Sequence, residues 1–214
     1  MASRDQEQVA KDQGVPIEGG RLTDTGDRTA AIWLLLVVAV GVAIAAVLFA
    51  AVGGPAGAIA LAVTAAVGIF AYRRARVWAH WENPQLYFPS SSSLRLGEDI
   101  VVRFRRRARR SGGAEGSSLT AKLVCTEWVQ YRVGTDTHTV TETVLDRELT
   151  VTPHHTADLM DCDLRVQVPV FDAPPSMRLP DNRVQWKIVV NIVSPGIPDD
   201  DSTFTVAVLP EVVL

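Results

Sequence analysis

Apolar and polar residues alternate along the second half of the chain with the period of two that is typical of β-strands. Between 119 and 133 the phase of this alternation slips, which predicts a β-bulge near Thr126. No stretch after residue 82 keeps a helical period. The clearest alternating stretches are 100–104, 164–170, 184–192 and 204–208. The pattern predicts seven or eight strands that form an antiparallel two-sheet β-sandwich over 85–214.

The first half of the chain contains a long apolar run, because residues 29–72 include no charged side chain. A membrane-spanning helix needs about 20 apolar residues, and one helix over this run would be ~66 Å long, about twice the hydrocarbon thickness. The sequence VGGPAG at 52–57 favours a turn, since its glycines bend freely and its proline suits the start of a helix. The run therefore predicts a transmembrane hairpin with helices over 30–52 and 55–72.

Small residues recur on both predicted helices at the spacing that lets helix backbones approach closely. They are Gly41, Ala45, Ala58, Ala62 and Ala66. These residues indicate either specific helix packing or simply an Ala- and Gly-rich composition, and the pattern does not separate the two.

Charges that flank the apolar run predict its orientation. Arg21 and Arg28 precede the first helix, and Arg73, Arg74 and Arg76 follow the second. The positive-inside rule then places both termini in the cytoplasm and makes the chain an integral protein of an inner or plasma membrane. A signal peptide would be shorter and would not be followed by a second apolar helix. Around the hairpin we expect a disordered polar tail over 1–28 and a basic, aromatic juxtamembrane linker over 73–84.

The net charge of −3 does not indicate a nucleic-acid-binding protein, but its distribution is uneven. Residues 73–110 hold ten Arg against three acidic residues, whereas 111–214 hold seven Lys or Arg against fifteen acidic residues. At a cytoplasmic membrane face the basic part predicts contact with anionic lipid headgroups, and the alternative is a solvated loop. The candidate residues are Arg73, Arg74, Arg76, Arg103, Arg105, Arg106, Arg107, Arg109 and Arg110.

Two segments of the predicted sandwich share features with a known family. They are LRLGEDIVVRF at 94–104 and VPVFDAPPSMRLPDNRVQWKIVV at 168–190. Together they resemble the early strand and the late Pro-Ser segment of arrestin-like domains. The matching residues are Leu96, Gly97, Glu98, Ile100, Pro169, Pro175, Ser176, Trp186 and Ile188. The resemblance implies an immunoglobulin-like sandwich used as a protein-binding scaffold. The chain departs from arrestins proper in having one sandwich, a membrane hairpin and no phosphate-sensing polar core.

The Pro-rich loop before Trp186 is either a stiff connection or a partner-binding loop. Its residues are Pro174, Pro175, Ser176 and Met177. Trp186 is expected in the core of the domain.

No residue set in the chain demands a catalytic or metal-binding chemistry. His154 and His155 lie near Asp161, Cys162 and Asp163, but their spacing matches no zinc pattern. The acidic run 199–201 lacks the alternation of a calcium loop and indicates a solvated loop. The serines form no recognisable triad, and no Gly-rich phosphate loop is present. We therefore expect no enzyme activity, no cofactor, no small-molecule substrate and no nucleic-acid partner.

The sequence as a whole predicts a membrane-anchored β-sandwich that acts as an interaction or scaffold module, with the lipid bilayer and an unidentified protein as partners. The alternative is an accessory subunit of a larger membrane complex in which the hairpin makes the main contacts. A third possibility is an extracytoplasmic sandwich with Cys125 bonded to Cys162, since reduced thiols are the rule only in the cytosol.

Overall fold

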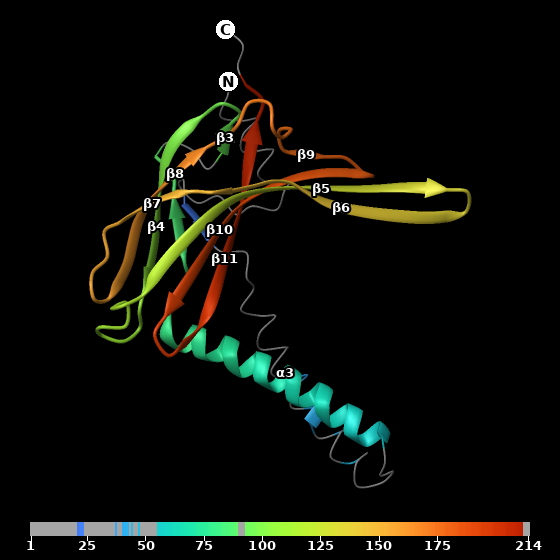
Figure 1. The fold of residues 1–214 in the computed structure, drawn as a ribbon, viewed down its shortest axis with the longest axis vertical. Helices are drawn as coiled ribbons and strands as arrows, with labels where there is room; N and C mark the ends of the chain where they lie inside the picture. Colours follow the sequence, from blue (N-terminus) through green and yellow to red (C-terminus); the bar gives the residue numbers. More distant parts are fainter. Residues whose placement is uncertain are drawn as a thin grey trace.

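Two β-sheets that face each other form the body of the molecule (Figure 1). The computed structural model describes residues 21–23, 37, 40–42, 44, 47, 55–89 and 93–211. The first sheet contains, in spatial order, β1 (Arg21–Thr23), β2 (Gln85–Tyr87), β4 (Asp99–Arg107), β8 (Leu159–Gln167) and β7 (Thr150–Pro153). The second contains β3 (Ser93–Arg95), β11 (Ile197–Leu209), β10 (Asn182–Ser194), β5 (Ser118–Val133) and β6 (Asp136–Glu148), with β9 (Met177–Arg178) paired to β10. The predicted β-sandwich is confirmed, and the described strand pairs are antiparallel except for β3 with β11.

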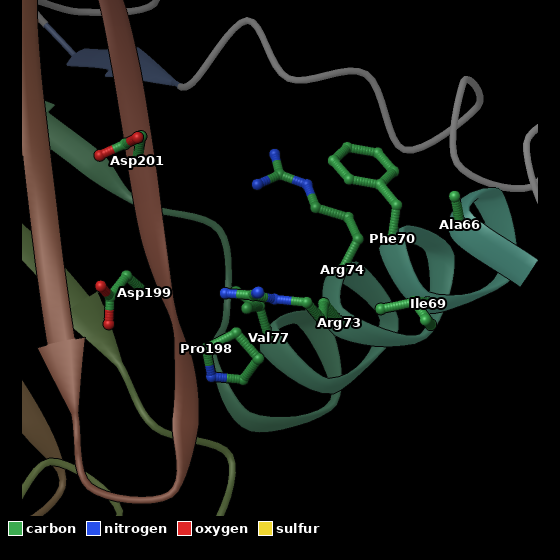
Figure 2. A pocket seen from close by; sticks show the side chains of 9 residues that line it. All are labelled: Ala66, Ile69, Phe70, Arg73, Arg74, Val77, Pro198, Asp199 and Asp201. Carbon is green, nitrogen blue, oxygen red and sulfur yellow. The ribbon is translucent and has the colours of Figure 1, made fainter.

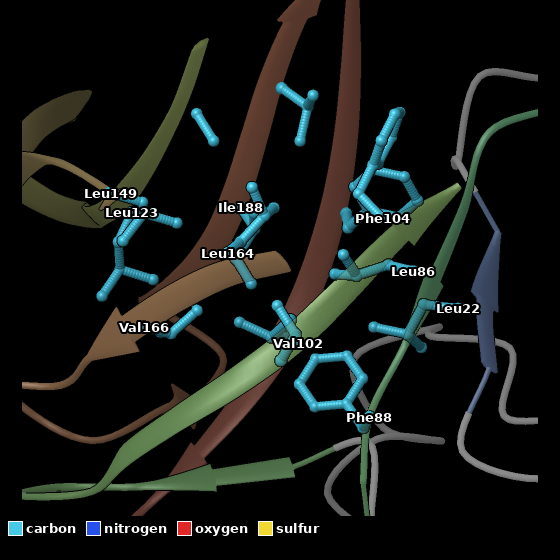
Figure 3. Packing of buried hydrophobic residues seen from close by; sticks show 14 of the residues in the cluster. Leu22, Leu86, Phe88, Val102, Phe104, Leu123, Leu149, Leu164, Val166 and Ile188 are labelled. Carbon is cyan, nitrogen blue, oxygen red and sulfur yellow. The ribbon is translucent and has the colours of Figure 1, made fainter. Parts of the chain in front are cut away.

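The core lies between the sheets and is built from the alternating apolar positions of the long strands (Figure 3). Val102 and Phe104 of β4 face this space from one sheet, and Ile188 of β10 faces it from the other. Phe104 meets Phe204 of β11 edge to face, with ring centroids 6.1 Å apart. Trp186 is fully buried, as the sequence predicts. The period-two pattern thus identifies the inward faces of these strands.

Two local backbone features follow from the sequence. The register of β5 against β6 shifts between Cys125 and Thr126, at the position predicted for a bulge, but the extra residue is Val144 of β6. Gly97 has a φ of 79° and donates its N–H to the carbonyl of Val168, in the turn between β3 and β4. Because L-residues rarely adopt such a φ, glycine suits this turn, which ties the two arrestin-like segments together.

The transmembrane hairpin predicted for 29–72 is wrong. A single helix, α3 (Pro55–His80), replaces the second hairpin helix and the linker expected over 73–84. Its last turns bury Ala71 and Val77 and pack on β11, so this end of the helix belongs to the sandwich (Figure 1). No helix among the described residues is long and apolar enough to cross a membrane. Most of the first predicted helix, 30–52, lies outside the described residues.

The structure also bears on two further expectations, the integral-membrane localisation and the disordered tail over 1–28. The integral-membrane localisation with both termini in the cytoplasm followed from the hairpin and its flanking arginines, and it is overturned with the hairpin. The disordered tail expected over 1–28 is wrong at Arg21–Thr23, which forms β1 beside β2. The apolar side chain of Leu22 is only 1% exposed, which gives this short polar segment a reason to join the sheet. The rest of the tail lies outside the described residues.

The β5–β6 hairpin extends beyond the body of the sandwich as a two-stranded arm (Figure 1). The arm turns at Gly134, which has a φ of 64°. All residues from 131 to 143 are exposed, so the distal part of the arm makes little contact with the core. This arm is the most solvated part of the six-stranded sheet.

Candidate interaction site

The free edge of β6 is the longest strand edge that lacks a partner among the described residues. β6 ends the order of its sheet and pairs only with β5, through residues Asp136 to Glu148. An exposed strand edge presents backbone N–H and C=O groups that can pair with another strand. Proteins usually blunt such edges with Lys, Pro or bulges, and residues 136–143 contain none of these. The edge is therefore open to strand addition.

The side chains of the arm are ordered in rows across β5 and β6. His138 stacks on Tyr131 of β5, with ring centroids 5.6 Å apart and planes inclined by 22°. In the same face Val140 lies opposite Val129, and Glu142 lies opposite Glu127. Two acids opposite each other repel, and Glu127 is also contacted by the side-chain amide of Asn182 at 3.2 Å. The Thr-rich segment TDTHTVTETV at 135–144 is β-prone, but its sequence alone does not mark it as a sheet edge.

A second candidate site lies where α3 meets the sandwich, and a buried carboxylate organises it. Asp200 of β11 accepts hydrogen bonds from Arg74 of α3 at 2.7 Å and from Arg106 of β4. Arg106 is 4% exposed and also donates to the carbonyl of Glu82 at 3.0 Å. Its guanidinium lies 5.7 Å from the ring centre of the buried Trp81. The acidic run at 199–201, expected as a solvated loop, is instead part of β11. The alternation of that strand buries its middle carboxylate.

A groove of about 400 Å³ lies between α3 and the first residues of β11 (Figure 2). Ile69 and Phe70 contribute apolar surface from the helix, and Asp199 and Asp201 contribute carboxylates from β11. Arg73 reaches into the same groove. Ala66, one of the small residues considered for helix packing, lines the end of this groove. Ala58 and Ala62 are exposed on α3. A Cβ added at Gly41 would meet no described side chain within 4 Å, and Ala45 lies outside the described residues.

Most of the arginines proposed for lipid contact are engaged within the protein. Arg103 and Arg105 share Asp161, at 2.7 and 3.1 Å. Arg76 and Arg109 donate to backbone carbonyls, while Arg74 and Arg106 bind Asp200. Arg106 is buried and is therefore removed from any surface role. Arg73, Arg107 and Arg110 are exposed.

Two carboxylates that bind arginines of the first sheet, Asp161 and Asp99, have lowered pKa values. Burial acts to raise the pKa of Asp161, but hydrogen bonds from Arg103 and Arg105 outweigh it and leave the pKa below its usual value. A forked contact with Arg165, helped by the amide of Gln167, lowers the pKa of Asp99 to about 2. These pairs join β4 to β8 on the outer face of the first sheet.

The Pro-rich loop is fastened to the sandwich at several points. The indole N–H of Trp186 donates to the carbonyl of Pro174 at 2.9 Å. Ser176 exchanges two hydrogen bonds with the backbone of Val208, and Met177 pairs with Val184 as part of β9. Beside the loop, Phe171 is 95% exposed, a residue that sequence reasoning did not single out. Its position four residues after the end of β8, in a loop, is the signal that could have marked it.

The two cysteines are buried, whereas His154 and His155 bind polar groups of β8. Cys125 and Cys162 are both buried and unbonded, so the disulfide considered for an extracytoplasmic domain does not form in this structure. Burial raises the pKa of each thiol to about 12. His154 binds Asp163 at 2.9 Å, and the N–H of Asp161 donates to His155 at 3.3 Å. No group of three potential metal ligands occurs among the described residues.

Comparisons with known proteins add little to this picture. No family model and no curated protein matches the chain. Among solved structures, the chain is similar to the sporulation control protein Spo0M from Bacillus subtilis, with 11% identity and a TM-score of 0.40. That match covers 62% of this chain and half of the other. A match to murine CRIg has 14% identity and a TM-score of 0.25, and covers 60% of this chain and 98% of the other. At these TM-scores the matches assign no family, and the β-sandwich is established by the two sheets of the structure itself.

Proposed function

We propose that the chain is a non-catalytic protein-interaction module whose sandwich presents the open edge of β6 to a protein partner. The observation that carries this proposal is the β5–β6 arm, which extends beyond the body and leaves one side of β6 unpaired among the described residues. An extended segment that adds to such an edge gains main-chain hydrogen bonds, and the side-chain rows supply specificity. The resemblance to arrestin-like domains fits the same scaffold role.

The described side chains support a binding role better than a catalytic one. The two thiols are buried and have raised pKa values, which disfavours the reactive thiolate. His154 and His155 are occupied by Asp163 and by the backbone of Asp161. The ion pairs of the first sheet join neighbouring strands and fix the scaffold that carries the arm.

Site-specific photo-crosslinking in living cells tests the proposal. A photoreactive residue replaces Val140 in the full chain, and a matched control replaces Val101, which is equally exposed on β4 in the other sheet. We expect a discrete protein adduct at position 140 that is absent at position 101. The adduct must also disappear when Thr139→Pro blocks the edge, because proline cannot donate to a ladder. Equal labelling at both positions, or an adduct that survives the proline, would refute a β6 recognition edge.

A further inference from the structure

We propose that the partner of the β6 edge is a second copy of this chain, paired antiparallel about a two-fold axis at Val140. This inference rests on the proposed function, since it requires that β6 be the recognition edge. It begins from the sequence Thr137-His138-Thr139-Val140-Thr141-Glu142-Thr143, in which every residue is exposed. The sequence reads the same in both directions about Val140, except that histidine on one side corresponds to glutamate on the other.

An isologous interface places each residue opposite its mirror position in the partner, so a self-complementary strand is what it requires. About Val140, antiparallel pairing sets His138 opposite Glu142 of the second copy, and this contact occurs twice. An imidazole N–H donates to a carboxylate whether the ring is neutral or protonated. The central contact is Val140 with its own copy, and Thr139 lies opposite Thr141. Each of these is a favourable cross-strand pair.

Neighbouring registers do not share this property. A two-fold axis at Thr139 would place Asp136 opposite Glu142, and an axis at Thr141 would place Asp136 opposite Asp146. An axis at Glu142 would set that acid against itself. Like charges directly opposite each other destabilise a sheet, so the charges disfavour the registers centred on Thr139, Thr141 and Glu142.

The surroundings of the arm favour the same pairing. Glu142 faces Glu127 across β5 and β6, and His138 of a second copy would place a hydrogen-bond donor beside that acidic pair. Val129 and Val140 would continue into the same residues of the partner as one apolar row across four strands. Because the arm extends beyond the body, antiparallel pairing of two β6 strands places the two sandwiches at opposite ends of the interface. A two-stranded ribbon is marginal alone, and two more strands stabilise it.

Sedimentation of charge variants of the full chain tests the proposal. One variant carries His138→Lys with Glu142→Lys, and the other carries His138→Glu. Each sets like charges opposite in its own dimer, so we expect the association constant to fall about tenfold or more relative to the natural chain. An equimolar mixture of the two variants sets every Lys opposite a Glu, and association should return. Glu115→Lys is the control, because Glu115 is exposed on a loop away from β6.

The register is tested separately with Val140→Cys and Thr141→Cys. The two-fold axis places residue 140 of one copy directly opposite residue 140 of the other, within reach of a disulfide. Residue 141 of one copy lies two residues out of register with residue 141 of the other, too far for a disulfide. The native thiols are buried and do not compete. We expect an oxidised dimer of Val140→Cys and at least about tenfold less of Thr141→Cys.

Association that is unchanged in both charge variants, or a mixture that fails to restore it, would overturn the self-pairing. Equal oxidation of the two cysteine variants would also overturn it. The photo-crosslink at position 140 separates this failure from failure of the proposed function. An adduct with an unlike protein that Thr139→Pro abolishes would leave the module intact and remove the homodimer, whereas no adduct would remove both.

Discussion

Arg106 of β4 and Asp200 of β11 form an ion pair inside the sandwich, and this pair joins the two sheets. Their side chains are 3% and 5% exposed, so neither charge is solvated in the way a surface charge is. Asp200 also holds Arg74 of α3 at 2.7 Å. One carboxylate therefore connects both sheets and the helix, at the end of the sandwich where α3 docks (Figure 1).

Replacing Asp200 by Asn should strongly destabilise the protein. The substitution removes the charge that Asp200 places against the buried guanidinium of Arg106, a change that typically costs about 3–5 kcal/mol of unfolding free energy. Urea denaturation of the full chain followed by circular dichroism measures it. The neighbouring Asp201→Asn is the control, because its carboxylate is exposed and accepts a hydrogen bond from the side chain of Asn191, and it should cost less than about 1 kcal/mol. Equal losses in the two variants would contradict the role given to the buried pair.

The ion pair between Asp99 and Arg165 should make stability depend on acid pH. The pKa of Asp99 is lowered from 3.8 to about 2 in the folded chain, so its contribution is present above pH 4 and is lost as pH falls toward 2. Unfolding free energies measured between pH 5 and pH 2 should fall less steeply in Asp99→Asn than in the natural chain. The exposed Asp199→Asn serves as the matched control for the loss of one surface carboxylate. An Asp99→Asn profile that matches the natural one would refute the linkage.

Glycine should be required more strictly at position 97 than at position 134. Both glycines have a positive φ, which costs an L-residue roughly 1–2 kcal/mol. Only at Gly97 does a Cβ also meet a side chain, the Cγ2 of Val170 at 3.0 Å, whereas nothing lies within 4 Å of Gly134. Gly97→Ala should therefore lower the midpoint of thermal unfolding more than Gly134→Ala does. The reverse order would show that the turn is not closely packed against β8 and its following loop.

Trp186→Phe should loosen the Pro-rich loop. The change removes the N–H that Pro174 accepts and leaves that carbonyl without its donor, at a cost of about 1–3 kcal/mol. Limited proteolysis should then cut near the exposed Phe171 faster than in the natural chain. Trp128→Phe provides the comparison, because its ring is only partly buried and contacts Arg183 at 5.9 Å. Unchanged cleavage near Phe171 would indicate that other contacts hold the loop.

The strands were predictable from sequence because their inward faces are uniformly apolar, as along β10 from Val184 to Ile192. The register shift between Cys125 and Thr126 lies where the alternation of β5 slips, but the extra residue, Val144, belongs to β6 and was not predicted. The extension of α3 beyond residue 72, to His80, was not predictable from hydropathy. The arginines after Tyr72 are typical of the end of a membrane segment. In the structure, however, Arg74 binds the carboxylate of Asp200, which is 126 residues away in sequence.

The candidate site was only partly predictable for a related reason. The Thr-rich segment at 135–144 was recognisable as a strand, but whether a strand lies at an edge depends on which strands pair, and that is a property of the whole sheet. The burial of Arg106 and Asp200 was also not predictable, because each lies in a run of like charges. The two residues meet only because the two sheets pack face to face. Leu22 was placed in a polar tail for lack of any local apolar period.

Hydrogen–deuterium exchange at the β6 amides of the full chain tests the central claim most directly. If β6 has a free edge that a second chain covers, alternate amides between 136 and 144 exchange rapidly in dilute protein and become protected as concentration rises. The amides that donate to β5 stay protected throughout and provide an internal reference. Full protection of every β6 amide in dilute protein would show that the edge is already covered. Exchange that does not change with concentration would show that no second copy binds it.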